Sequence, residues 1–376
     1  MLTLGIEEEY LLLDPDSGLP VPKSEQVRTL ARRRSGLPAD ELMPELLQDQ
    51  VEIATPVCRT LDDATRHLTR LRRAVGAAAS AVGCRPAMTG TEPFPSPVPT
   101  PPTDEPHYRE LAAETPRVIH EHSICGMHVH VAVPDRDQGV VALNRLRPWL
   151  PVLVALAANS PLWSGRDTGF ASWRTLVYGR WPVSGPPPVF ADGADYERRT
   201  QALLDARVIR GRGRLYWHAR LSERHPTVEV RAMDVQVRID EAVTLAGLTR
   251  GLVATALRED AGKAPPPHHL PHELLTAATW HAARDGLDGD LLDPRSLRGE
   301  PAADVVAALL DHVAAALGEA GDLDRVTTGV RRLLDEGNGA HRQRRALRTG
   351  GPALVGLLTG AAPDAGPAVD EPQMLL

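Results

Sequence analysis

Four short segments of this sequence alternate between apolar and ionisable residues, and this repeated alternation constrains the fold more than any other feature. The segments are residues 4–11, 50–54, 126–133 and 227–233. Side chains two positions apart on a β-strand point to the same face, so each segment would have one apolar and one ionisable face. The ionisable faces carry Glu7, Glu9, Glu52, His128, His130, Glu229 and Arg231. We therefore expect a sheet that helices cover on one face only.

The rest of the chain supplies the helices for such a sheet. Apolar residues recur at spacings of three and four over residues 60–82, which predicts an amphipathic helix. Further helices are expected at residues 139–158, 195–206, 239–258, 272–284, 302–319 and 324–335. Residues 92–106 are rich in proline and residues 161–193 mix Gly, Pro, Trp and Arg, so both are expected to be loops. Strands and helices do not alternate in a regular βαβ order, which predicts an α+β fold around a mainly antiparallel sheet.

Composition limits the kinds of binding partner that we expect and the cellular compartment in which the chain would work. The chain has 42 Lys and Arg against 49 Asp and Glu, a net charge of −7, so a role in binding nucleic acid is not expected. No run of about 18 uncharged apolar residues could span a bilayer, and no basic segment followed by an apolar run suggests secretion. The odd number of cysteines, three, fits a reducing cytoplasm.

Lysine is scarce, and this limits the possible chemistry. Only Lys23 and Lys263 occur, and the sequence has no G-x-x-x-x-G-K-[ST] motif, which excludes a P-loop. If a nucleotide binds, metal ions and arginines must hold its phosphates.

The ionisable faces themselves suggest a metal site. A solvated sheet face could explain any one strand, but it would normally carry Lys, Thr and Ser as well. Several carboxylates gathered on one concave face repel one another and raise one another's pKa unless cations neutralise them. Mg²⁺ or Mn²⁺ suits oxygen ligands of this kind, and Mg²⁺ held by carboxylates and substrate phosphates is typical of phosphoryl transfer.

These segments resemble a known family. The strongest matches are residues 5–10 (GIEEEY), 45–56 (ending VEIATP), 125–131 (CGMHVHV) and 225–231 (HPTVEVR). Weaker matches are residues 157–161, 165–169, 178–182, 287–290 and 337–340. The order and spacing of these segments, taken together, resemble those of the YbdK-type carboxylate–amine ligases. These form the type-two branch of the glutamate–cysteine ligase family, which is distantly similar to glutamine synthetase.

The resemblance implies a fold and a set of roles. It implies one catalytic domain over residues 1–360 with a funnel-shaped antiparallel sheet. The composition of residues 361–376 (AAPDAGPAVDEPQMLL) separately predicts a disordered tail. The resemblance also implies two or three Mg²⁺ ions, with Mn²⁺ as a substitute, and the ligands Glu7, Glu9, Glu45, Glu52, His128 and Glu229. Arg231 would act beside the transferred phosphate of ATP, next to Glu229 and His128, and Glu52 and Arg231 would be the residues most needed for catalysis.

Three further residues would lie toward the substrates. Arg166 matches a position that contacts the acid substrate, and His130 falls beside the metal-binding histidine. His218 stands where an aspartate is common in the family, which leaves the identity of the substrate open.

The implied reaction is the ATP-dependent joining of a small carboxylic acid to an amine through an acyl phosphate, with glutamate and cysteine as the family default. A homodimer is also expected from the family. Two alternatives remain at this point. His128 and His130 resemble the His-x-His of metal-dependent amidohydrolases, although the chain lacks the βα order of their barrel. A non-catalytic relative that binds a nucleotide or metabolite is the other alternative.

Overall fold

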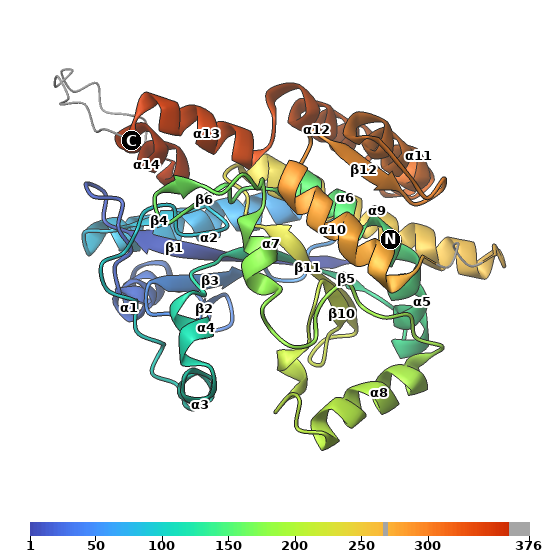
Figure 1. The fold of residues 1–376 in the computed structure, drawn as a ribbon, viewed down its shortest axis with the longest axis horizontal. Helices are drawn as coiled ribbons and strands as arrows, with labels where there is room; N and C mark the ends of the chain where they lie inside the picture. The colour runs from blue at the N-terminus through green and yellow to red at the C-terminus, as the bar shows by residue number, and fades with distance from the viewer. Residues whose placement is uncertain (266–269, 361–376) are drawn as a thin grey trace.

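The computed structural model describes residues 1–265 and 270–360, and its central feature is a seven-stranded antiparallel sheet (Figure 1). Its strands are β1 (Leu4–Leu13), β2 (Leu42–Pro44), β3 (Gln50–Ala54), β4 (Arg85–Ala87), β5 (Gly126–Ala132), β10 (Ala219–Leu221) and β11 (Thr227–Asp234). Their order is β10-β11-β5-β1-β3-β2, and β4 also pairs with β1. The four alternating segments form β1, β3, β5 and β11, and the predicted fold class is confirmed.

The register of the sheet brings the ionisable residues side by side. Glu9 lies opposite Glu52 across β1 and β3, and Glu7 lies opposite His128 across β1 and β5. Glu229 of β11 pairs with His130 of β5. Directly opposed side chains on antiparallel strands have Cβ atoms about 4.5–5.5 Å apart, so strands distant in sequence build one continuous polar surface.

The apolar face of the sheet is covered by helices. They include α2 (Leu61–Ala81), α5 (Arg136–Leu146), α6 (Leu150–Ala157) and α9 (Ile239–Ala261), which all contact strands of the sheet. α2 begins with a capping box, in which the Thr60 hydroxyl accepts from the Asp63 N–H while the Asp63 carboxylate accepts from Thr60. α9 is buried nearly all round because it packs between the sheet and two outer helices, α11 (Ala302–Ala320) and α12 (Leu323–Glu336). Figure 1 shows α11 and α12 beyond α9.

The expected helix over residues 139–158 is two helices. α5 ends at Leu146, a 3₁₀ turn follows at Arg147–Trp149, and α6 begins at Leu150. Pro148 causes the break because proline lacks the N–H that a continuous helix requires. By length and composition this run could cross a membrane, but 83% of its most apolar window is buried inside the protein, as in a core helix.

The expected loop over residues 161–193 contains short elements. They are the hairpin β6 (Leu162–Trp163) and β7 (Arg166–Asp167), the helix α7 (Trp173–Tyr178), and β8 (Ser184–Gly185), which pairs with β9 (Tyr216–Trp217). Next come α8 (Gly193–Asp205), close to the expected helix, and a 3₁₀ turn at Arg212–Arg214.

The remaining elements surround this core. They are α1 (Ser24–Ser35), α3 (Pro106–Glu114), α4 (Pro116–His120), α10 (His272–Asp285), β12 (Asp290–Asp293), β13 (Arg298–Pro301), α13 (Gly339–Thr349) and α14 (Gly351–Thr359). One hydrophobic cluster includes buried residues from Leu4 to Leu358. The disordered tail expected at residues 361–376 lies outside the described residues.

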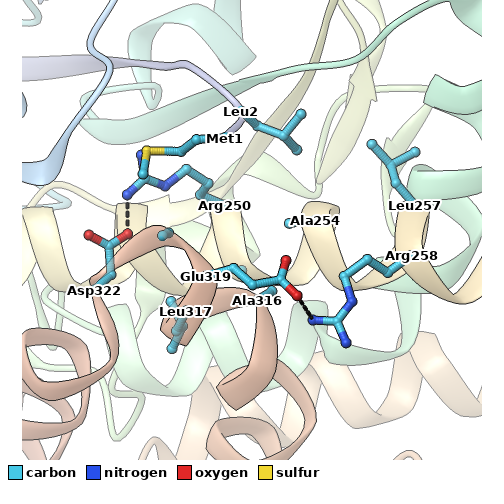
Figure 2. Close-up of a pocket in the computed structure, with 12 residues that line it drawn as sticks. Met1, Leu2, Arg250, Ala254, Leu257, Arg258, Ala316, Leu317, Glu319 and Asp322 are labelled. Atoms are coloured by element: carbon cyan, nitrogen blue, oxygen red, sulfur yellow. Dashed lines mark hydrogen bonds and ion pairs between the residues drawn. The ribbon is translucent and has the colours of Figure 1, made fainter.

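A small cavity of about 260 Å³ lies between the N-terminus, α9 and the end of α11 (Figure 2). Its arginines already have partners, since Arg250 pairs with Asp322 and Arg258 pairs with Glu319 at 3.1 Å. None of the expected site residues lines it. The expected metal ligands instead line a cavity on the other side of the sheet.

Candidate active site

A cavity of about 1010 Å³ opens on the polar face of the sheet. Its walls come from β1, β2, β3, β5 and β11, from the turn between β10 and β11, and from Tyr108 of α3. Among the residues that the structure describes, seven carboxylates line it, Glu7, Glu9, Asp40, Glu45, Glu52, Glu223 and Glu229, against four guanidinium groups, Arg212, Arg220, Arg224 and Arg231. The cavity thus combines an excess of acids with a smaller group of arginines.

One end of the cavity is formed by carboxylates. Glu9, Glu45 and Glu52 each place an oxygen within 4.8 Å of the others. Glu45 reaches this cluster because it follows β2, which pairs with β3. Burial, reinforced by the charge of Glu9, raises the pKa of Glu45 to about 8. Burial and the charges of Glu7, Glu45 and Glu9 raise the pKa of Glu52 well above its usual range. The fold therefore holds like charges together at an energetic cost.

Glu7 lies between two imidazoles. Its carboxylate is 2.9 Å from Nδ1 of His128 and 3.2 Å from Nε2 of His130. Burial opposes ionisation of Glu7, but the hydrogen bonds from the two histidines lower its pKa well below the usual range. Burial and the charge of Arg231 lower the pKa of His128. His130 is also buried, yet its contacts with Glu7 and Glu229 raise its pKa.

The other end of the cavity joins Glu229 to two arginines. Arg220 donates to Glu229 through Nε at 2.8 Å and through a terminal nitrogen at 3.2 Å. Arg231 also donates to Glu229. Burial opposes ionisation of Glu229, but the charges of these two arginines lower its pKa well below the usual range. Arg220 is a site residue that the sequence analysis missed, although it lies directly opposite Glu229 in the register.

The residues present fit divalent cations. In the described part of the chain, three groups each have ligand atoms within 4.8 Å of one another, namely Glu7–Glu52–His128, Glu7–His130–Glu229 and Glu9–Glu45–Glu52. Nε2 of His128 is buried and has no hydrogen-bond partner among the described residues, and it lies 3.6 Å from Glu9. Carboxylate oxygens and an imidazole nitrogen with a free lone pair are ligands that Mg²⁺ and Mn²⁺ accept. All six expected ligands line the cavity.

Two expected substrate residues do not line this cavity. Arg166 lies exposed in the β6–β7 hairpin. His218 is buried, with its ring 6.3 Å from that of Tyr178, and burial together with the charge of Arg174 lowers its pKa to about 3. His130, the third, does line the cavity, and its Nδ1 is 3.0 Å from the Thr227 hydroxyl. The substrate roles of all three residues stay predictions.

Comparison with known proteins places this arrangement in a family. Residues 3–361 match the sequence profile of the glutamate–cysteine ligase family 2. A relative from Mycolicibacterium vanbaalenii, provisionally named glutamate–cysteine ligase 2-2, is 45% identical over 346 residues, which is 92% of this chain and 93% of that one. Another from Saccharopolyspora erythraea, provisionally named glutamate–cysteine ligase 2-1, is 43% identical over 347 residues, or 92% and 90% of the two chains.

Solved structures share the fold at much lower sequence identity. The glutamate–cysteine ligase of Francisella tularensis in complex with AMP gives a TM-score of 0.73 at 14% identity and covers 96% of this chain and 88% of that one. A bifunctional glutathione synthetase from Pasteurella multocida gives 0.68 at 14% identity and covers 96% and 52%.

Fold, cavity and relatives together define an ATP-dependent ligase that forms carbon–nitrogen bonds. The chain belongs to the glutamate–cysteine ligase family 2, and the resemblance seen in the sequence is confirmed. The amidohydrolase alternative loses its structural basis, because the sheet that carries His128 and His130 is antiparallel rather than a parallel barrel.

Proposed function

We propose that this protein joins the carboxyl group of a small acid to an amine through an acyl phosphate, with glutamate and cysteine as the first substrates to test. One observation carries the proposal: a single cavity has a cluster of carboxylates on and beside β1, β3 and β2, and guanidinium groups on β11 and β10, on the other side of β5. The carboxylates can hold cations, and the cations and arginines together can receive the phosphates of ATP. A substrate carboxylate would then attack the γ-phosphorus and release ADP, and the amine would displace phosphate from the acyl carbon.

The proposed cation ligands are Glu7, Glu9, Glu45, Glu52, His128 and Glu229, for two or three Mg²⁺ ions. When bound, Mg²⁺ would neutralise the phosphate oxygens and favour the transfer of the phosphoryl group. Glu52 is placed to hold more than one ion because it belongs to two of the three ligand groups. Burial and the neighbouring carboxylates raise the pKa of Glu52 well above its usual range, so a bound cation would offset an unfavourable negative charge.

Arg231 is the proposed phosphoryl-binding residue. Its guanidinium lines the cavity and is held by Glu229 and by the Tyr178 hydroxyl at 3.1 Å. In the described structure its second terminal nitrogen donates to no protein acceptor, so these N–H groups are free to bind phosphoryl oxygens. A guanidinium suits this task because its planar donors can bind two oxygens at once.

The direct test of the acyl-phosphate route follows an oxygen atom from the carboxyl group of the acid into inorganic phosphate. Purified protein is incubated with Mg²⁺ and ATP and a panel of amines and acids labelled with ¹⁸O in the carboxyl group, beginning with glutamate and cysteine. We expect ADP release that requires both substrates, an amide product, and one ¹⁸O atom transferred from the acid to inorganic phosphate. Release of AMP and pyrophosphate, or unlabelled phosphate, would contradict the acyl-phosphate route. A non-catalytic nucleotide-binding protein would bind ATP without turnover.

A second test separates catalysis from binding at Arg231. Arg231→Lys keeps the charge but loses the two-donor geometry, so we expect kcat to fall about 10²–10³-fold, as for the loss of one transition-state donor. ATP affinity, measured by calorimetry, should change much less. Weak ATP binding with normal turnover at saturation would make Arg231 a ground-state binding residue.

A further inference from the structure

The backbone at Arg231 departs from the regular sheet. β11 pairs with β5 up to Val230 and again from Met233, with a register shift between them, so Arg231 lies in an irregular, bulge-like stretch. Such stretches bend a strand and redirect a side chain, and they are common beside active sites. The Arg231 N–H donates to the carbonyl of His218 at 2.7 Å, and its carbonyl accepts from Arg174, whose terminal nitrogens both lie at 3.4 Å.

Arg174 belongs to α7, and the last residue of the same helix holds the Arg231 side chain. Nε of Arg231 donates to the hydroxyl of Tyr178 at 3.1 Å. α7 is in turn tied to the end of β11, because its N-cap residue Ser172 donates to Asp234 at 2.9 Å. One short helix therefore supports both the backbone and the side chain of Arg231.

Tyr178 has little freedom to move. Its side chain is buried, and its ring lies edge-on to Tyr216 at 5.8 Å and roughly parallel to His218 at 6.3 Å. The guanidinium of Arg174 lies 5.1 Å from the ring centre, a favourable cation–π distance. Because the Tyr178 hydroxyl is held in place, it can also hold the Nε of Arg231 in place.

We propose that Tyr178 is a positioning residue, whose hydroxyl sets the orientation of the Arg231 guanidinium for phosphoryl transfer; the inference rests on the proposed function of Arg231. Glu229 holds one terminal nitrogen and Tyr178 holds Nε, so the plane of the guanidinium is fixed at two points. Because the guanidinium is planar, these two contacts also fix the direction of the second terminal nitrogen, which has no protein acceptor in the described structure. Without the hydroxyl, the group would be held only at the terminal nitrogen that contacts Glu229 and, at 3.3 Å, Nδ1 of His128, and the plane could turn about that nitrogen.

The test compares two tyrosines of one aromatic cluster. Tyr178→Phe removes the hydroxyl that binds Arg231, whereas Tyr216→Phe removes one for which the described structure shows no hydrogen bond. For Tyr178→Phe we expect kcat to fall roughly tenfold, the loss typical of one hydrogen bond to a charged group. Its KM for ATP and its melting temperature should stay near those of the wild type, and Tyr216→Phe should leave kcat and KM within about twofold. Equal effects of the two variants on kcat, or a change in KM alone, would overturn the inference.

A second readout does not need turnover. The ¹⁵N–¹H resonance of the Arg231 Nε–H, assigned by its absence in Arg231→Lys, reports exchange of that proton with water. We expect slow exchange in the wild type and in Tyr216→Phe, and at least tenfold faster exchange in Tyr178→Phe. Unchanged exchange in Tyr178→Phe would overturn the positioning role. Absence of ADP release by the wild type with every acid and amine would count against the proposed function and would leave this measurement valid.

Discussion

Neighbouring glutamates on the two faces of β1 have opposite electrostatic surroundings. Glu8 points to the helix side, where it is fully buried and accepts two hydrogen bonds from Arg72, at 2.6 and 2.9 Å. Arg72 also donates to two backbone carbonyls, so this charge pair is fully satisfied. Glu7 and Glu9 point to the cavity side, where they share their surroundings with Glu45 and Glu52.

Because its two faces differ in this way, β1 contributes to stability on one face and to the candidate site on the other. On the helix side the buried charge of Glu8 is paired with that of Arg72, as a packed core requires. On the cavity side the carboxylates outnumber the cationic groups, and the pKa values of Glu45 and Glu52 are raised. Active sites commonly hold such destabilised charges because the ligand supplies what the protein lacks.

The largest expected effect on folding is on the helix side. Glu8→Ala leaves the buried guanidinium of Arg72 unpaired, so we expect the free energy of unfolding to fall by about 3–5 kcal/mol. Urea denaturation measures it. Arg66→Ala is the matched control on the same helix, because its pair with Asp63 is 67% and 26% exposed and should contribute no more than about 1 kcal/mol. Similar losses in the two variants would contradict the contrast between paired core charge and surface charge.

The largest expected effect on activity is on the cavity side. Glu52→Gln removes a shared ligand charge, so ATP turnover should fall at least about 100-fold, beyond the loss typical of residues that only support a metal ligand. The metal-free protein should be as stable as the wild type, or more so, because one repelling charge is gone. Steady-state kinetics and thermal unfolding with chelator measure the two quantities. Full activity would contradict the ligand role of Glu52, and a clear loss of stability would assign it a structural role instead.

A smaller effect concerns pH. Because the pKa of Glu45 is raised to about 8 in the fold, the folded state binds protons more tightly than the unfolded chain. The metal-free protein should therefore lose stability as pH rises from about 4.5, the ordinary glutamate value, through 8. Thermal melts across this range should show a decline that is shallower in Glu45→Gln and is reduced by Mg²⁺. A melting temperature that rises over the same interval would contradict the assigned direction.

The smallest expected effect is on the cysteines. Cys58, Cys84 and Cys125 are all buried, and burial raises their pKa values, so none is poised as a thiolate. An acyl-phosphate route also needs no thiol. Cys125→Ala should keep kcat within about twofold, as measured by ADP release. A thioester trapped on Cys125 would show a different mechanism.

The alternation of residue types was enough to predict the central strands and most of the site. A period of two fixes which side chains share a face, so Glu7, Glu9, Glu52, His128 and Glu229 were assigned to one surface before any strand order was known. Which strands are neighbours depends on long-range pairing that no local period encodes. Glu45, which lies outside the alternating segments, came from the family resemblance alone.

The residues that were missed lie where local patterns end. Tyr178 belongs to a segment of Gly, Pro, Trp and Arg with no clear period, and its helix is fixed by tertiary contacts such as that between Ser172 and Asp234. Arg220 could be recognised only once its strand was paired with β11. The ion pair of Glu8 had a visible signal, since Arg72 falls on the apolar side of the predicted helix, four residues after Leu68.

The seven described carboxylates of the cavity would affect which charged ligands can enter it. When all are ionised, the described carboxylates exceed the described guanidinium groups of the lining by three, so a polyanion with bound divalent ions would be repelled less than the same polyanion without them. On the proposed function, the lining would therefore favour a nucleotide whose phosphates carry divalent ions over the bare nucleotide. Free ATP should then be a poor competitor of its magnesium complex, and the level of free magnesium around the protein would set its working rate.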